Sequence, residues 1–126
     1  MKRGKLTQNG VHLQEHEWRT ADFFLEQGKD IELIPKSEIK GFHLGDFMMD
    51  ELPWEAKAPV GKGKYNVQNK LQEAAQQSCN VVIDLRRSKM QEEKAVKAYE
   101  HEFYNNKSLK RMKIIKKNEE VLDFSK

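Results

Sequence analysis

The sequence predicts a single α/β domain in which a mixed sheet is flanked by helices. Segments with helical and with strand-like patterns alternate along the chain, and the 126 residues are enough for one hydrophobic core. The run Val81-Val82-Ile83 is continuously β-branched, which is typical of a strand covered by helices on both faces. Residues 1–10 are polar and basic. We therefore expect a flexible basic N-terminus over residues 1–10 and one domain over residues 11–126.

The expected elements follow from apolar spacing and from turn-forming residues. Helices show apolar side chains three and four residues apart, and strands are short runs rich in β-branched and aromatic residues. Gly28 ends the first helix and Pro35 the first strand. The helices are expected at about 13–27, 67–78 and 89–104, and the strands at 31–34, 42–49, 54–58, 81–83, 109–115 and 121–124. The strand–helix–strand order over residues 54–83 predicts a crossover between parallel strands.

The charge distribution favours a polyanionic partner more than the net charge does. The chain has 23 Lys and Arg against 20 Asp and Glu, a formal net charge of +3. However, residues 57–72 contain four lysines and residues 107–117 six basic residues, and neither stretch contains an acid. The alternative is a solvated face whose acids lie elsewhere on the chain.

Cysteine usage and hydropathy exclude several classes of protein. Cys79 is the only cysteine, which excludes an intramolecular disulfide and argues against a cysteine-based zinc site. No stretch approaches the roughly 20 apolar residues that span a bilayer. We therefore expect no membrane segment and a cytoplasmic site of action.

The segment from Asp46 to Lys57 is the part of the sequence most indicative of chemistry. Side chains alternate along a strand, so Glu55 and Lys57 point to one face. A two-residue hairpin loop at 50–51 places Asp46 opposite Glu55, whereas a loop at 51–52 places Asp46 opposite Lys57. In either register the three charged groups converge.

Such a cluster suits metal-dependent phosphodiester hydrolysis. Two neighbouring carboxylates repel each other unless a cation lies between them, and Mg²⁺ prefers hard oxygen ligands. The expected ligands are Asp46, Glu55 and the Ala56 carbonyl, with Zn²⁺ or Mn²⁺ as alternatives to Mg²⁺. Lys57 would orient a water or offset charge that develops on the phosphate. The alternative is a solvated hairpin face with a surface ion pair worth less than about 1 kcal/mol.

The pattern Asp46, then Glu55-Ala56-Lys57, then helix and strand resembles the core of the PD-(D/E)xK nucleases, with Gly45 in the position of the proline. The sequence resembles one branch more closely over roughly residues 15–87, namely the CdiA C-terminal tRNase domain of bacterial contact-dependent inhibition toxins. The residues that carry this resemblance are Trp54-Glu55-Ala56-Lys57-Ala58-Pro59, Gly61-Lys62-Gly63-Lys64, Asn69, Leu71, Ala74, Gln77-Ser78, Asn80 and Ile83-Asp84-Leu85-Arg86-Arg87.

The resemblance implies a restriction-endonuclease-like fold, dependence on Mg²⁺ or Zn²⁺, tRNA as the substrate and a cognate immunity protein as partner. It also implies a toxin domain that a larger exported protein delivers into a target cell. Such nucleases often add an acid from the first helix, and Glu17 is the best match, although a solvated acid at the helix start is an equal alternative. The candidates for nucleic-acid binding are Lys62, Lys64, Asn69, Gln77, Arg86 and Arg87.

Two further functions stay open at the level of sequence. The same site would serve a DNA endonuclease, because nothing in the motif senses a 2′-hydroxyl. A non-catalytic nucleic-acid-binding module would instead carry the same charged residues only as surface.

Overall fold

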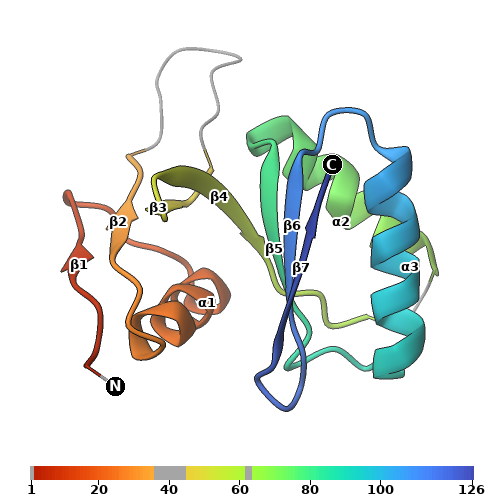
Figure 1. Ribbon diagram of the computed structural model, residues 1–126, viewed down its shortest axis with the longest axis horizontal. Coiled ribbons are helices and arrows are strands. Elements are labelled where there is room, and N and C mark those ends of the chain that lie inside the picture. The colour runs from red at the N-terminus through yellow and green to blue at the C-terminus, as the bar shows by residue number, and fades with distance from the viewer. Residues whose placement is uncertain (1, 36–44, 62–63) are drawn as a thin grey trace.

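A computed structural model of the chain describes residues 2–35, 45–61 and 64–126, apart from the side chains of Lys64 and Tyr65. Within it, seven strands form one sheet whose spatial order is the same as their order in the chain, β1 to β7. Helix α1 lies against one side of the sheet and α2 and α3 against the other (Figure 1). The expected mixed sheet flanked by helices is therefore confirmed.

The strands are β1 (Leu6–Thr7), β2 (Ile31–Leu33), β3 (Phe47–Met49), β4 (Leu52–Lys57), β5 (Asn80–Asp84), β6 (Arg111–Ile115) and β7 (Val121–Ser125), and the helices are α1 (Glu15–Glu26), α2 (Lys64–Gln77) and α3 (Glu92–Asn105). Every expected helix and strand is present with shifted ends, and residues 42–44 of one expected strand lie outside the described residues. β4, β5 and β6 are mutually parallel, with α2 and α3 as their connections, while the β2–β3, β3–β4 and β6–β7 pairs are antiparallel. The predicted crossover between parallel strands is thus confirmed.

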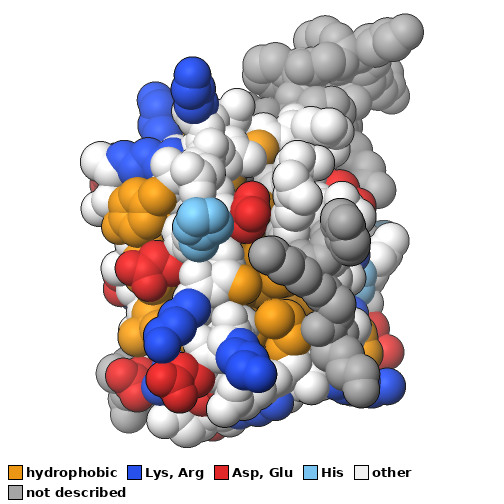
Figure 2. Space-filling view, turned by 90° about the vertical axis from the view of Figure 1, so that its right-hand side faces the viewer, with side chains coloured by type: hydrophobic (Ala, Val, Ile, Leu, Met, Phe, Trp, Pro, Cys, Tyr) orange, Lys and Arg blue, Asp and Glu red, His pale blue; other side chains and the backbone are white. Residues whose placement is uncertain are grey.

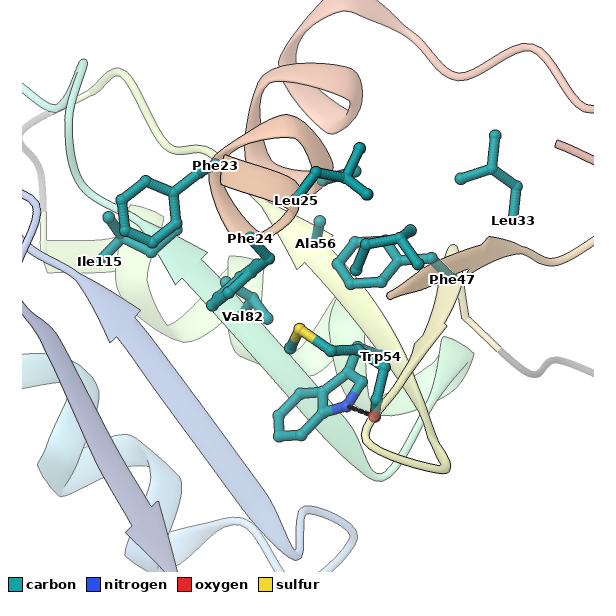
Figure 3. Close-up of a cluster of buried hydrophobic side chains, with 12 residues drawn as sticks. Phe23, Phe24, Leu25, Leu33, Phe47, Trp54, Ala56, Val82 and Ile115 are labelled. Carbon is teal, nitrogen blue, oxygen red and sulfur yellow. Dashed lines mark hydrogen bonds between the residues drawn. The ribbon is translucent and has the colours of Figure 1, made fainter. Parts of the chain in front are cut away.

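The β-branched run in β5 is buried because each face of the sheet carries its own core. Val82 joins the cluster beneath α1, whereas Val81 and Ile83 join the cluster beneath α2 and α3. Figure 3 shows the first cluster, in which Phe24 of α1 lies over Val82 and the Trp54 indole donates a hydrogen bond to the Met49 carbonyl at 3.0 Å. β4 and β5 are therefore central strands, and a charged residue on them is held by packing on both sides.

The N-terminal segment differs from the expectation. β1 pairs in parallel with β2, and the Gly4 N–H donates to the Leu25 carbonyl at 2.8 Å. A Cβ at Gly4 would lie 1.7 Å from the Lys29 carbonyl oxygen, so only glycine permits this approach. Residues 6–7 thus pair with the sheet edge inside the segment expected to be a flexible N-terminus, and the domain boundary at residue 10 stays a prediction. A two-residue strand leaves no periodic signal in the sequence.

The β3–β4 hairpin has its two-residue loop at 50–51, the first of the two registers considered. Asp50 and Glu51 both have positive φ, 52° and 67°, as a two-residue type I′ turn requires. The register pairs Met49 with Leu52 and Phe47 with Trp54. This is the alternative that brings Asp46 beside Glu55.

Candidate active site

Asp46 stands where β3 meets β4, at an irregularity in their pairing. Its N–H donates to the Trp54 carbonyl at 2.8 Å, although Trp54 is already the partner of Phe47. Two consecutive residues thus face Trp54, the arrangement of a β-bulge, which commonly redirects a side chain. The Asp46 carboxylate is directed along the sheet, where its Oδ2 accepts the Ala56 N–H at 2.8 Å.

Gly45 makes this close approach possible. Its φ is +99°, and a Cβ there would lie 2.7 Å from the Trp54 carbonyl oxygen. A side chain at position 45 would therefore be strained and would collide with backbone. The glycine found in place of the proline of the motif name has a structural reason.

Glu55 and Lys57 extend from β4 toward α2. Glu55 is only 5% exposed, and the Lys57 Nζ lies 3.5 Å from Glu55 Oε2 and 3.5 Å from Glu73 Oε2 of α2. The lysine therefore lies between two carboxylates, of which Glu73 is the more exposed. Sequence reasoning missed Glu73, which lies on the helix that follows the motif.

The two carboxyl groups are electrostatically unfavourable as ions. Burial, followed by the charge of Glu55, raises the pKa of Asp46 to about 8, against the opposing hydrogen bond from the Ala56 N–H. Burial also raises the pKa of Glu55, against the opposing charge of Lys57. The protein thus holds two carboxyl groups together with too little positive charge of its own to keep both ionised.

Glu17 of α1 approaches the same pair from the other face of the sheet. Its charge contributes to raising the pKa of both Asp46 and Glu55. One of its oxygens, Oε1, also accepts the Gln14 N–H at 3.0 Å at the start of the helix. Glu17 is thus a neighbour of the pair that also caps α1, and its proposed role in the site stays a prediction.

The donor set fits magnesium better than zinc. Among the residues that the structure describes, no three His, Cys, Asp or Glu side chains are close enough to hold a metal by themselves. Mg²⁺ is commonly held by one or two carboxylates with waters and substrate phosphates, whereas zinc sites generally take three or four protein ligands. Asp46 and Glu55 supply the two hard oxygen donors. Ala56 contacts the pair through its N–H, and its carbonyl as a ligand remains a prediction.

Only some of the residues expected to bind nucleic acid lie in the described part of the chain. Lys62 lies outside the described residues, as does the side chain of Lys64. Asn69 and Gln77 lie one helical turn before and after Glu73, so they share the face of α2 that contacts Lys57. Asn69 is exposed and Gln77 is half-buried. Their role in binding nucleic acid stays a prediction.

Arg86 and Arg87 follow β5 and have different surroundings. Arg86 donates to both carboxylate oxygens of buried Asp84, through Nε at 3.0 Å and a terminal nitrogen at 2.7 Å. Arg86 also donates to the Arg19 carbonyl at 3.0 Å and lies over the Phe23 ring. It therefore stabilises the contact between α1 and β5. Arg87 is exposed and is held through its Nε by the Ala58 carbonyl at 2.9 Å.

Fold and site together define a small α/β domain in which one hairpin and one helix bring a buried carboxyl group, a half-buried one and a lysine together. Residues 44–121, more than half of the chain, match the contact-dependent growth inhibition CdiA C-terminal domain, and the chain belongs to this family. This membership is consistent with a bacterial toxin domain. The match begins just before Asp46 and includes Glu55 and Lys57, but not Glu17.

A solved structure supports the fold independently. The chain is similar to one described as "CdiA-CT/CdiI toxin and immunity complex from Burkholderia pseudomallei", with a TM-score of 0.69 and 16% sequence identity over 98% of this chain and 100% of the other. No curated protein sequence matches the chain. Among the described residues, no helix is long and apolar enough to cross a membrane.

Proposed function

We propose that the chain is a metal-dependent endonuclease of the PD-(D/E)xK type that hydrolyses phosphodiester bonds of tRNA as a bacterial toxin domain. The observation that carries the proposal is the carboxyl pair of half-buried Asp46 and buried Glu55, with Lys57 beside Glu55 on β4. Residues with only a structural role seldom form such a pair, because two neighbouring acids withdrawn from water destabilise the folded protein unless a cation neutralises them.

Asp46 and Glu55 would hold the metal, for which Mg²⁺ is the first choice and Mn²⁺ or Zn²⁺ are the alternatives. A divalent cation bound there supplies Lewis-acid polarisation of a phosphate oxygen and a more acidic water. The Ala56 N–H fixes one Asp46 oxygen, which leaves the other oxygen for a ligand. The bulge and Gly45 hold the carboxylate in place, so the site is organised before substrate arrives.

Lys57 supplies the positive charge that the reaction needs on the substrate side. Its ammonium group lies 3.5 Å from the carboxylates of Glu55 and Glu73, within reach of a phosphate held at the same place. Negative charge that develops on the phosphate oxygens is stabilised by a cation fixed in a partly buried site. Glu73 orients the lysine, because it holds the Nζ from the α2 side.

Family membership and the fold support the biological part of the proposal. The similar solved structure is titled as a toxin with its immunity protein. By analogy, this chain would be delivered into a target cell, act in its cytoplasm and be neutralised by an immunity protein. The assignment of tRNA as substrate rests on the resemblance of the segment from Trp54 to Arg87 to the CdiA C-terminal tRNase domain.

The test is cleavage of total tRNA and of duplex DNA by purified protein with Mg²⁺, Mn²⁺, Zn²⁺ or EDTA. Lys57→Ala and Glu55→Gln are the site variants, and Lys97→Ala on the exposed face of α3 is the matched control. We expect metal-dependent tRNA cleavage that falls at least about 100-fold in both site variants and is unchanged in the control. Cleavage of duplex DNA alone would move the function to a DNA endonuclease. Equal behaviour of parent and site variants would leave a non-catalytic binding module.

A further inference from the structure

A second candidate binding site lies between α1 and the ends of β4 and β5. It is a cavity of about 270 Å³. α1 contributes His16, next to Glu17, and the residue that follows β4 contributes the second wall: Ala58, next to Lys57. The cavity thus adjoins the two elements that carry the proposed catalytic groups.

The charges around this cavity do not cancel. Asp84 is neutralised by Arg86, and Asp22 by Arg3 at 2.7 Å. Arg87, which also lines the cavity, forms no ion pair with any carboxylate in the described part of the chain. The net balance at the cavity wall is therefore positive.

Arg87 is also held in a fixed position. The bond from its Nε to the Ala58 carbonyl, at 2.9 Å, fixes the guanidinium plane against β4. Arg87 lines the cavity, and its two terminal nitrogens, which make no hydrogen bond to the described residues, form a planar fork. Such a fork matches two oxygens of one phosphate.

The α3 side of the molecule offers less to a polyanion. Figure 2 shows the α3 side of the molecule, where basic and acidic side chains are interspersed over the part that the structure describes. On α3, Lys97 is paired with Glu93 one turn earlier in the helix. The cavity, in contrast, combines concavity with an arginine that has no ion pair among the described residues, and it lies next to the chain positions of Glu17 and Lys57.

We propose that this cavity is a subsite for a backbone phosphate of the bound nucleic acid, with Arg87 as the principal contact and His16 as a second donor. The subsite rests on the proposed function, because it places the phosphodiester chain along the end of β4, beside the bond to be cleaved. Arg86 is excluded from this role, since its guanidinium is already bound to Asp84. The ligand chemistry is a phosphodiester, common to RNA and single-stranded DNA.

The test measures binding without cleavage. Lys57→Ala protein in EDTA is titrated with a fluorescent single-stranded RNA oligonucleotide and with the DNA oligonucleotide of the same sequence, at several salt concentrations. Arg87→Ala and His16→Ala are introduced in this background, with Lys97→Ala as the matched control and thermal unfolding to monitor folding. Arg87→Lys retains the charge but loses the fork.

For Arg87→Ala we expect binding of both oligonucleotides to weaken about five- to tenfold, with a salt slope smaller by about one. Arg87→Lys should recover only part of the loss, and His16→Ala should lose less than Arg87→Ala. If Arg87→Ala binds and responds to salt as Lys97→Ala does, or if the background protein binds neither oligonucleotide, the subsite is wrong. If Arg87→Ala weakens binding but the parent protein cleaves no nucleic acid, the subsite is supported while the proposed nuclease function fails. The two failures are therefore distinguishable.

Discussion

Replacing Asp46 by asparagine is expected to stabilise the metal-free protein while it removes activity. The side-chain amide that Asp46→Asn introduces still offers a carbonyl oxygen to the Ala56 N–H, so the hydrogen bond of 2.8 Å has an acceptor. What disappears is a half-buried carboxyl group whose pKa is raised from 3.8 to about 8, by burial and by the charge of Glu55. The variant therefore separates the electrostatic cost of the site from its geometry.

The sign of the pH dependence follows from proton linkage. Between the two pKa values the folded chain retains a proton that the unfolded chain has released, so the stability of the parent falls as pH rises through this window. The unfolding free energy of the parent can fall by at most about 1.4 kcal/mol per pH unit, or about 6 kcal/mol over the whole window. Water that enters the half-buried site reduces this cost, and we expect the variant to be about 2 to 3 kcal/mol more stable at pH 8 and nearly equal at pH 4.

The assay is urea unfolding of parent and variant in EDTA at pH 4, 6 and 8. Asp50→Asn is the matched control, because Asp50 is exposed in the turn and asparagine tolerates its positive φ. Adding Mg²⁺ at pH 8 should stabilise the parent and not Asp46→Asn, because only the parent retains both carboxylates. A stability difference between parent and variant that is the same at all three pH values would refute the reasoning.

Two further changes test the packing that surrounds the site. Gly45→Ala should lower the free energy of unfolding by about 2 to 3 kcal/mol and abolish cleavage, because the positive φ and the contact with the Trp54 carbonyl exclude a Cβ. Unfolding and activity are measured on the same variant, and a fully active, equally stable variant would contradict the prediction. Tyr99→Phe should raise stability by about 1 to 2 kcal/mol, because the Tyr99 hydroxyl is buried with no hydrogen-bond partner among the described residues; thermal unfolding measures this, and a less stable variant would indicate a partner for the hydroxyl.

Much of the architecture was predictable because it depends on local pattern. A few neighbouring residues were enough to predict each of three elements: the β-branched run predicts β5, the apolar spacing predicts α1, and the polar turn predicts the hairpin. The short N-terminal strand was not predictable. β1 exists because Gly4 lies against Lys29 and because β2 has an open edge, and neither condition is visible in residues 1–10.

By itself, the sequence determined that Glu55 and Lys57 share a face, because side chains alternate along a strand, whereas the direction of the Asp46 side chain also depends on the bulge opposite Trp54. Only the tertiary structure decided between the two hairpin registers, tied Arg86 to Asp84, brought Glu73 of α2 against Lys57, and left Arg87 at a cavity beside α1. The physical reason is that strand periodicity acts between neighbours in the chain. Ion pairing and burial instead depend on which helices and strand ends the fold brings together.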